Sequence, residues 1–175
     1  MKMSAKCVEN VPQRICILGC SGAGKSTLAR RLGRDLELPV VHSDQLFWRP
    51  GWTPSPMEEF EARMLAEVEK PAWIFDGNYA GTLGLRLRRA QLVIWLDYPG
   101  WLCLYRVLKR IWQSRGQVRP DMGPGCPERL DWSFLWFVLT FRHYERPKLV
   151  QALEGWQGRL IHLTRPPAAG FRLEV

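Results

Sequence analysis

Residues 19–27 have the types and spacing of a loop that cradles phosphate groups. Gly19 is followed, after four residues, by Gly24, Lys25 and Ser26, and the glycines let backbone N–H groups wrap an anion that a Cβ atom would obstruct. An apolar stretch at residues 15–18 precedes the loop like a buried strand, and apolar residues at helical spacing follow it. The helix dipole then points at the same anion. The alternative interpretation is a plain glycine turn between a strand and a helix.

This motif predicts a site for a nucleoside triphosphate, with ATP and Mg²⁺ as the expected cofactors. We expect Lys25 to reach the β- and γ-phosphates and the Ser26 hydroxyl to ligate Mg²⁺. The residues predicted to hold the nucleotide are Gly19, Ser21, Gly22, Ala23, Gly24, Lys25, Ser26 and Thr27.

Three aspartates each follow an apolar segment that is expected to be a strand: Asp44, Asp76 and Asp97. In parallel α/β sheets, ligands gather outside the carboxyl ends of the strands. We predict that Asp76 holds Mg²⁺ together with Ser26, the alternative being a helix cap. Asp44 is predicted to orient or deprotonate an acceptor hydroxyl, the alternative being a loop or cap residue. Asp97 is expected to cap the next helix.

Positive charge is concentrated in one segment. Of the net charge of +8, residues 86–119 carry +7, with Asp97 as the acid and these basic residues: Arg86, Arg88, Arg89, Arg106, Lys109, Arg110, Arg115 and Arg119. Such a block can serve nucleic acid, a membrane surface or a polyphosphate. The phosphate loop favours the polyphosphate, because a phosphoryl group in transfer is surrounded by cations. Solvated helix faces and nucleic acid remain the alternatives.

Strand and helix patterns alternate along the chain. Apolar strands are expected at residues 15–18, 39–42, 73–75, 92–96 and 160–163. Helices are expected at 25–36, 55–69, 83–89, 101–115 and 131–144, with a break before Pro147 and a last turn to 153. Ser55 and Glu58 read as a capping box, and residues 43–54 and 116–127 read as loops. The pattern predicts an α/β fold, a three-layer sandwich with a five-stranded parallel sheet.

Length and composition fit a single domain of 175 residues. The longest apolar stretch, residues 132–141, is about half of a membrane span, and no apolar segment follows the charged N-terminus as it would in a signal peptide. The cysteines (Cys7, Cys16, Cys20, Cys103 and Cys126) lack the paired spacing of a zinc site. We therefore expect a cytoplasmic protein with no membrane partner.

The order of these motifs resembles the adenylate kinase and shikimate kinase group of P-loop phosphotransferases, and more closely the topology modulation (FlaR-like) protein family. The resemblance covers about residues 13–165. The residues that carry it are the phosphate loop, His42–Asp44 with Phe47 and Trp48, Asp76–Tyr79, residues 102–110, and residues 119–127. It implies a P-loop NTPase of the nucleoside monophosphate kinase or shikimate kinase type, with an acceptor-side insert at about 43–70 and a lid at about 116–130.

The resemblance also implies roles for arginines. Arg106 and Arg110 occupy the position of arginines that contact the ATP phosphates, and their spacing of four residues places both on one helix face. Arg119 resembles a lid arginine, and Arg142 and Arg146 resemble a second arginine group. The predicted catalytic set is Lys25, Asp44, Asp76, Arg106, Arg110 and Arg119.

The chain departs from the adenylate kinase pattern where the acceptor would bind. Asn78 and Tyr79 replace an aromatic residue and a proline, and Trp48 and Trp52 lie where a monophosphate nucleotide would dock. These tryptophans are suited to stack on a base or a sugar, and the alternative is a hydrophobic cover over the core. The expected function is an ATP-dependent phosphotransferase with a small-molecule acceptor. The alternatives are a nucleotide-gated DNA- or RNA-binding regulator and an NTPase that uses water as acceptor.

Overall fold

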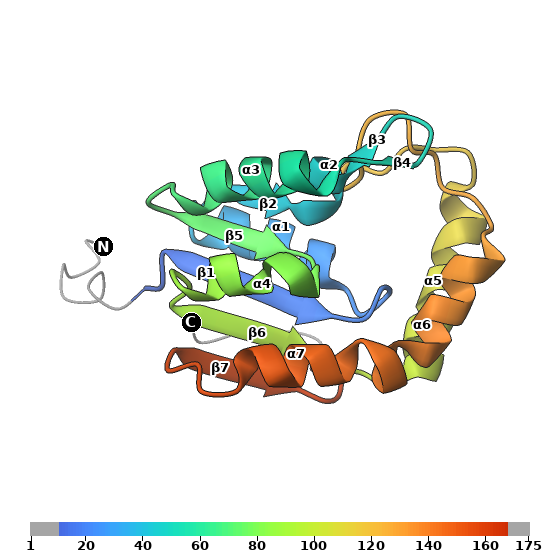
Figure 1. Ribbon diagram of the computed structural model, residues 1–175. Coiled ribbons are helices and arrows are strands. Elements are labelled where there is room, and N and C mark those ends of the chain that lie inside the picture. The colour runs from blue at the N-terminus through green and yellow to red at the C-terminus, as the bar shows by residue number, and fades with distance from the viewer. Residues whose placement is uncertain (1–10, 168–175) are drawn as a thin grey trace, which may run out of the picture.

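The computed structural model describes residues 11–167, so Cys7 and the charged N-terminus considered above lie outside the described part. Five parallel strands form the central sheet (Figure 1). They are β1 (Arg14–Gly19), β2 (Val40–His42), β5 (Trp73–Asp76), β6 (Leu92–Leu96) and β7 (Arg159–Leu163), in the order β2-β5-β1-β6-β7. The predicted α/β fold with a five-stranded parallel sheet is confirmed.

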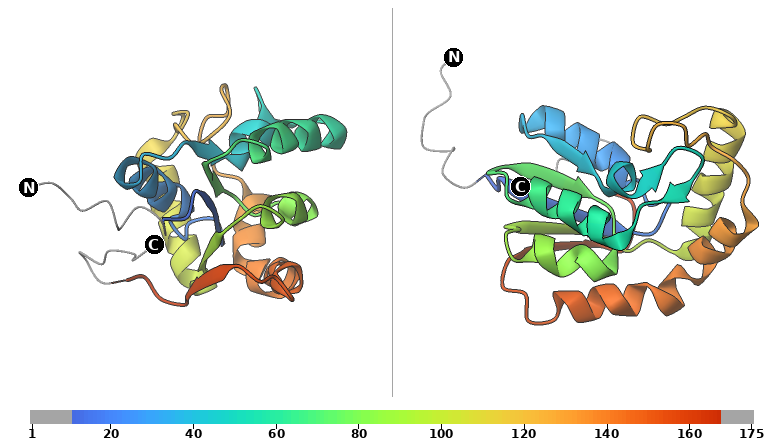
Figure 2. Two further views of the ribbon diagram at one scale, coloured as in Figure 1. Left: turned by 90° about the vertical axis from the view of Figure 1, so that its left-hand side faces the viewer. Right: turned by 45° about the horizontal axis from the view of Figure 1, so that its top comes forward.

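Helices cover both faces of the sheet and make the sandwich three-layered (Figure 2). Helix α1 (Lys25–Asp35) lies on one face, and α3 (Met57–Val68), α4 (Ala80–Leu87) and α7 (Arg146–Leu153) lie on the other. Strands β5 and β6 are buried along their whole length. Burial on both faces explains why these strands are continuously apolar rather than alternating.

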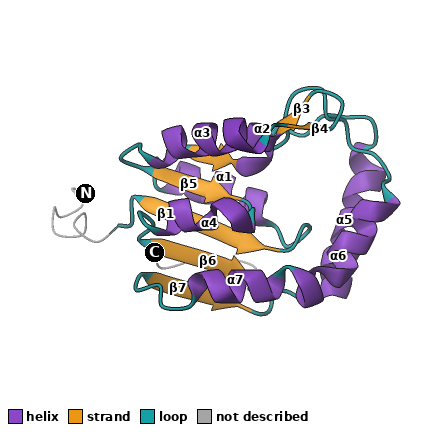
Figure 3. Cartoon of the chain, in the orientation of Figure 1, coloured by secondary structure: helices purple, strands orange, loops and turns teal. Residues whose placement is uncertain are grey.

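Two further helices stand beyond the carboxyl ends of the strands (Figure 3). Helix α5 (Gly100–Ser114) packs against α6 (Trp132–Tyr144). Residues 115–131 connect the two helices and include the predicted lid (about 116–130), and we keep the name lid for this connection. The Asp131 carboxylate caps α6 by accepting hydrogen bonds from the N–H groups of Ser133 and Phe134. Within residues 11–167, none of the helices combines the length and apolarity needed to cross a membrane.

Residues 43–54 are more ordered than the predicted loop. They form a short helix, α2 (Ser43–Phe47), and an antiparallel hairpin of β3 (Trp48–Arg49) and β4 (Thr53–Pro54). Segments this short carry no periodic pattern, and their two prolines suggested a loop. Contacts with the lid, described below, hold the hairpin in place.

The predicted capping box at Ser55 is wrong. Helix α3 begins at Met57, its N-cap is Pro56, and no side chain caps it. The Ser55 N–H instead donates to the Phe47 carbonyl at the end of α2, at 2.8 Å. Ser55 therefore closes the hairpin instead of opening the helix.

Candidate active site

A cleft of about 1200 Å³ lies at the carboxyl ends of the strands, between the sheet and helices α5 and α6. It gathers residues from the phosphate loop, two strand ends, the lid and α5. The sequence-predicted residues that line it are Ser21, Gly22, Ala23, Gly24, Lys25, Ser26, Thr27, Asp44, Asp76, Arg106, Arg110 and Arg119. Gly19 does not line the cleft; it lies at the end of β1, where an added Cβ would approach the Leu96 carbonyl oxygen to 2.4 Å.

The backbone of the phosphate loop has the shape of an anion cradle. Gly22 (φ 85°) and Gly24 (φ 98°) adopt left-handed conformations, and an added Cβ on Gly22 would approach the Cys103 carbonyl oxygen of α5 to 2.3 Å. Helix α1 begins at Lys25, so its free N–H groups face the cleft. The Lys25 ammonium donates to the Cys20 carbonyl at 3.2 Å and is thereby folded over the loop.

Asn78 anchors the phosphate loop to the end of β5. Its amide accepts a hydrogen bond from the Gly19 N–H at 2.9 Å and donates to the Gly19 carbonyl at 2.8 Å. Both backbone groups of Gly19 are thus satisfied by one side chain 59 residues away. In the sequence Asn78 is only a departure from the family pattern, because a contact between distant loops leaves no signal in one sequence.

Arg86 shapes the loop between β5 and α4, to which Asn78 belongs. This arginine is fully buried in α4, and its guanidinium donates to the carbonyl groups of Gly77, Asn78 and Tyr79. Tyr79 has a φ of 40°, a left-handed conformation that is unfavourable for an aromatic residue. Three hydrogen bonds from one rigid fork hold the loop in that conformation. Arg86 therefore belongs to the scaffold, and the basic block of the sequence is not one functional unit.

Asp76 lies buried at the end of β5, with one carboxylate oxygen 2.8 Å from Nδ1 of His42. Parallel pairing of β2 with β5 places these two residues in register. The histidine ring fixes the orientation of the Asp76 carboxylate in the cleft, a positioning role that the sequence did not indicate for His42.

Asp44 lies one strand away, where the Tyr79 hydroxyl donates to its carboxylate at 2.7 Å. Burial raises the pKa of Asp44 above its ordinary value, and the Tyr79 hydrogen bond opposes that rise. The positive charges of Lys25 and Arg119 also oppose the rise in this pKa, whereas the negative charge of Asp76 adds to it. The predicted acceptor-side carboxylate thus faces cations from both the phosphate loop and the lid.

Two lid carboxylates that the sequence did not indicate, Glu128 and Asp121, bind Arg110 of α5 and Arg119 of the lid. Both Arg110 (2.8 and 3.0 Å) and Arg119 (2.6 Å) donate to the buried Glu128, and Arg119 also donates to Asp121 at 2.5 Å. Burial opposes ionisation of Asp121, but Arg119 and a hydrogen bond from the Ser26 hydroxyl keep its pKa below the ordinary value. The lid therefore reaches the serine that was predicted to ligate Mg²⁺.

The remaining arginines separate into two groups. Arg106 lies over the Tyr98 ring at 5.7 Å and donates to the Ala23 carbonyl at 3.4 Å, beside the phosphate loop. Arg146 does not line the cleft; its Nε donates to Asp97 at 3.0 and 3.1 Å. The prediction that Asp97 caps the next helix is wrong, because Pro99 is the N-cap of α5 and Asp97 pairs with Arg146 and His162.

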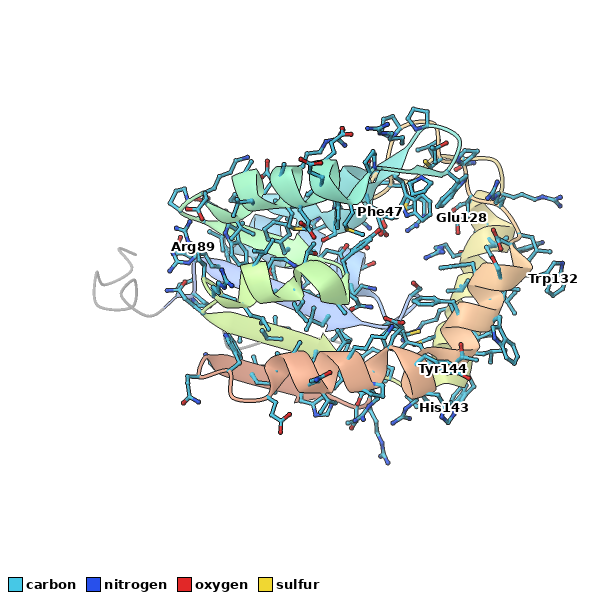
Figure 4. All side chains as sticks on the ribbon, viewed as in Figure 1. Phe47, Arg89, Glu128, Trp132, His143 and Tyr144 are labelled. Atoms are coloured by element: carbon cyan, nitrogen blue, oxygen red, sulfur yellow. The ribbon has the colours of Figure 1, made fainter. Side chains whose placement is uncertain are left out.

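The aromatic residues of the insert form one wall of the cleft. The rings of Phe47 and Trp48 lie 4.9 Å apart, those of Trp48 and Trp52 5.5 Å, and those of Phe47 and Tyr79 5.0 Å. Residues of the predicted lid contact this wall: the Trp52 indole donates to the Pro127 carbonyl at 3.1 Å. Figure 4 shows Phe47 and Glu128 on the two sides of the cleft opening.

The donor atoms fit a magnesium–triphosphate complex. Ser26, Asp76 and Asp121 offer hard oxygen ligands near the cradle, and Mg²⁺ bound to a nucleotide takes few protein ligands and several phosphate and water oxygens. Among residues 11–167, no cluster of three or more histidine, cysteine or acidic side chains could hold a metal without such help.

The comparisons with known proteins point to small-molecule kinases. No protein-family model matches the chain. A shikimate kinase of Corynebacterium glutamicum is 33% identical over 98 residues, which cover 49% of this chain and 58% of that protein. A shikimate kinase of Buchnera aphidicola is 32% identical over 114 residues, which cover 61% of this chain and 55% of that protein. Over these segments the chain is similar in sequence to shikimate kinases. It spans little more than half of the length of these two relatives.

Structural similarity extends over nearly the whole chain. Shikimate kinase from Acinetobacter baumannii, solved in complex with shikimate, superposes with a TM-score of 0.56 at 21% identity, covering 95% of this chain and 90% of the other. This likeness establishes the fold. The shikimate kinase side of the sequence resemblance is therefore supported, and the closer resemblance to the topology modulation family is not supported by these matches.

Proposed function

We propose that the protein is an ATP- and Mg²⁺-dependent kinase that transfers the γ-phosphoryl group to a hydroxyl of a small molecule. The observation that carries the proposal is the position of Asp44, which lines the same cleft as the phosphate loop, Lys25 and Arg119. A phosphoryl group held by these cations would lie next to a carboxylate that can accept a proton.

The predicted site residues then divide the work of the reaction among them. Lys25 and the N–H groups of the phosphate loop bind the donor phosphates, and Ser26 and Asp76 would hold Mg²⁺, which would neutralise phosphate charge. The acceptor oxygen attacks the γ-phosphorus as the bond to the bridging oxygen breaks. Its proton passes to Asp44.

The arginines and the lid act on the same step. Arg106, Arg110 and Arg119 face the cleft and would stabilise the charge that spreads over the transferring group. The lid would exclude water, which otherwise competes with the acceptor. The aromatic wall of Trp48 and Trp52 would bind the body of the acceptor on its apolar side.

A screen of ATP consumption against nucleosides, nucleotides, polyols and hydroxylated ring acids tests the proposal. We expect one acceptor class to raise turnover well above the rate in buffer. Lys25→Ala should weaken ATP binding about 10- to 100-fold while leaving the far-ultraviolet circular dichroism unchanged. Unchanged ATP affinity in the folded variant would refute the phosphate-cradle assignment.

Two results would favour the alternatives. ATP turnover that no acceptor stimulates would indicate an NTPase that uses water. Tight duplex DNA binding that depends on ATP and persists at physiological salt would indicate a regulator, since non-specific contacts of a basic surface are weak there.

A further inference from the structure

The side of α5 and α6 that faces away from the cleft carries two matching stripes of large side chains. In each helix the stripe occupies positions i, i+4, i+7 and i+11: Trp101, Tyr105, Leu108 and Trp112 in α5, and Trp132, Trp136, Leu139 and His143 in α6. The four tryptophans are between 66% and 84% exposed. We call these eight residues the outer face.

Helical geometry separates this outer face from the candidate active site. At about 100° per residue, the α5 stripe lies on the opposite side of the helix from Arg106 and Arg110, which line the cleft. In α6 the cleft is lined by Phe134 and Phe137, again away from the stripe. The two helices pack side by side, and Figure 4 shows Trp132 pointing away from the cleft.

Exposure of this kind is unfavourable for a protein without a partner at that surface. Monomeric proteins rarely expose contiguous apolar patches larger than a few hundred Å², and each tryptophan has a surface of roughly 150–250 Å². Nothing in the candidate mechanism uses these side chains. The outer face is therefore suited to contact something outside the chain.

The charges around the outer face select the partner. Neither α5 nor α6 contains an aspartate or a glutamate. Lys109 and Arg142 are exposed beside the stripes, and neither makes an ion pair with any residue in the described range 11–167. A second copy docked through the same face would place like charges against each other, because a two-fold contact is self-complementary. An anionic surface meets no such repulsion.

We propose that the outer face docks on the surface of an anionic lipid bilayer. Tryptophan and tyrosine concentrate at the membrane–water interface, where the ring is buried and its polar tip stays wet. Lysine and arginine beside them attract anionic headgroups. Leu108 and Leu139, in the middle of the two stripes, offer apolar surface to acyl chains but no ring on which a nucleobase could stack. Docking through this face leaves the cleft uncovered.

Flotation with lipid vesicles tests this proposal on the full chain. The probes are vesicles of phosphatidylcholine with and without phosphatidylglycerol, assayed at moderate salt. We expect binding to the anionic vesicles and at least about tenfold less to the neutral ones. Trp112→Ser combined with Trp136→Ser should abolish binding to the anionic vesicles. Tryptophan emission of the wild type should be quenched by brominated acyl chains.

Matched variants separate specific docking from general attraction. Lys109→Glu with Arg142→Glu should reduce binding more than about tenfold, whereas Arg34→Glu with Arg88→Glu, which reverses two exposed charges elsewhere, should change it little. Met57→Ser with Leu65→Ser controls for loss of exposed apolar surface on α3. Equal loss in all charge variants, retained binding in the tryptophan variant, or a dimer that disappears with Trp112 and Trp136 would overturn the proposal. So would tighter binding to single-stranded DNA than to vesicles.

Discussion

The Asp44 carboxylate accepts a hydrogen bond from the Tyr79 hydroxyl and is desolvated by burial. Desolvation raises its pKa above 3.8, so the active, ionised form is lost at a higher pH than for an ordinary aspartate. We expect activity to fall on the acidic side as pH drops through this raised pKa. Asp44→Asn should lower kcat by about 10²- to 10⁴-fold, measured with the acceptor that the screen identifies.

The same shift predicts an opposite effect on stability. A carboxyl whose pKa is raised by folding stabilises the protein below its unfolded pKa, and this contribution is lost as pH rises through the folded value. At neutral pH the ionised Asp44 therefore destabilises the fold, and Asp44→Asn should raise Tm while lowering kcat as stated above. Asp35→Asn, at the exposed end of α1, controls for the loss of one charge. A variant less stable than wild type at neutral pH would contradict this interpretation.

The residues that sequence predicted for the cleft are those whose chemistry is local to a motif. Lys25 and Ser26 follow from the phosphate loop, and Asp44 and Asp76 follow from their places after apolar strands. Asn78 and Glu128 act through partners 59 and 18 residues away. No spacing rule connects such partners, so one sequence cannot reveal them.

Among the structural elements, the loop between β5 and α4 depends on Arg86. A lysine there keeps the charge but cannot donate to three carbonyl groups in a fixed fork. Arg86→Lys should lower the free energy of unfolding by about 2–4 kcal/mol, because buried carbonyl groups lose their partners. Urea denaturation measures this change. Arg88→Lys, at the exposed neighbouring position, should stay within about 0.5 kcal/mol of wild type; an equally small effect at Arg86 would show that the loop holds itself.

Residues 86–119 look like one basic unit in the sequence because a count of charges does not show where each side chain lies. Arg86 is buried under a loop, Arg106 and Arg110 line the cleft, and Lys109 is exposed on the same helix outside the cleft lining. The helical period predicts that Arg106 and Arg110 share a face, but which face turns toward the cleft depends on how α5 packs on α6. The hairpin of β3 and β4 escaped prediction for a similar reason, since the lid supports it.

For the molecule as a whole, the sheet was predictable because burial on both faces leaves strands such as β6 entirely apolar. Crossover helices between successive strands then favour parallel pairing. The strand order β2-β5-β1-β6-β7 was not predicted. It places the ends of β2 and β5 together, and with them Asp44, Asp76 and His42.

Glu128 and Asp121 bear on how the affinity of the molecule for ATP depends on ionic strength. Arg110 and Arg119 already have carboxylate partners in the lid, so an incoming triphosphate would exchange one anion for another instead of meeting bare cations. The net number of small counter-ions released on binding would then be smaller than the number of arginines in the cleft. ATP affinity should accordingly vary only weakly with ionic strength.

Removing the negative charge of Glu128 should make ATP affinity depend more strongly on ionic strength. In Glu128→Gln we expect ATP to bind about three- to tenfold more tightly in dilute buffer, with a steeper loss of affinity as salt is added. Calorimetric titrations over a salt series measure both effects, with Glu154→Gln as an exposed control. Equal dependence of ATP affinity on salt in the variant and the wild type would mean that Arg110 and Arg119 keep their carboxylate partners when nucleotide binds. Unequal slopes would mean that the phosphates of ATP displace the Glu128 and Asp121 carboxylates from Arg110 and Arg119.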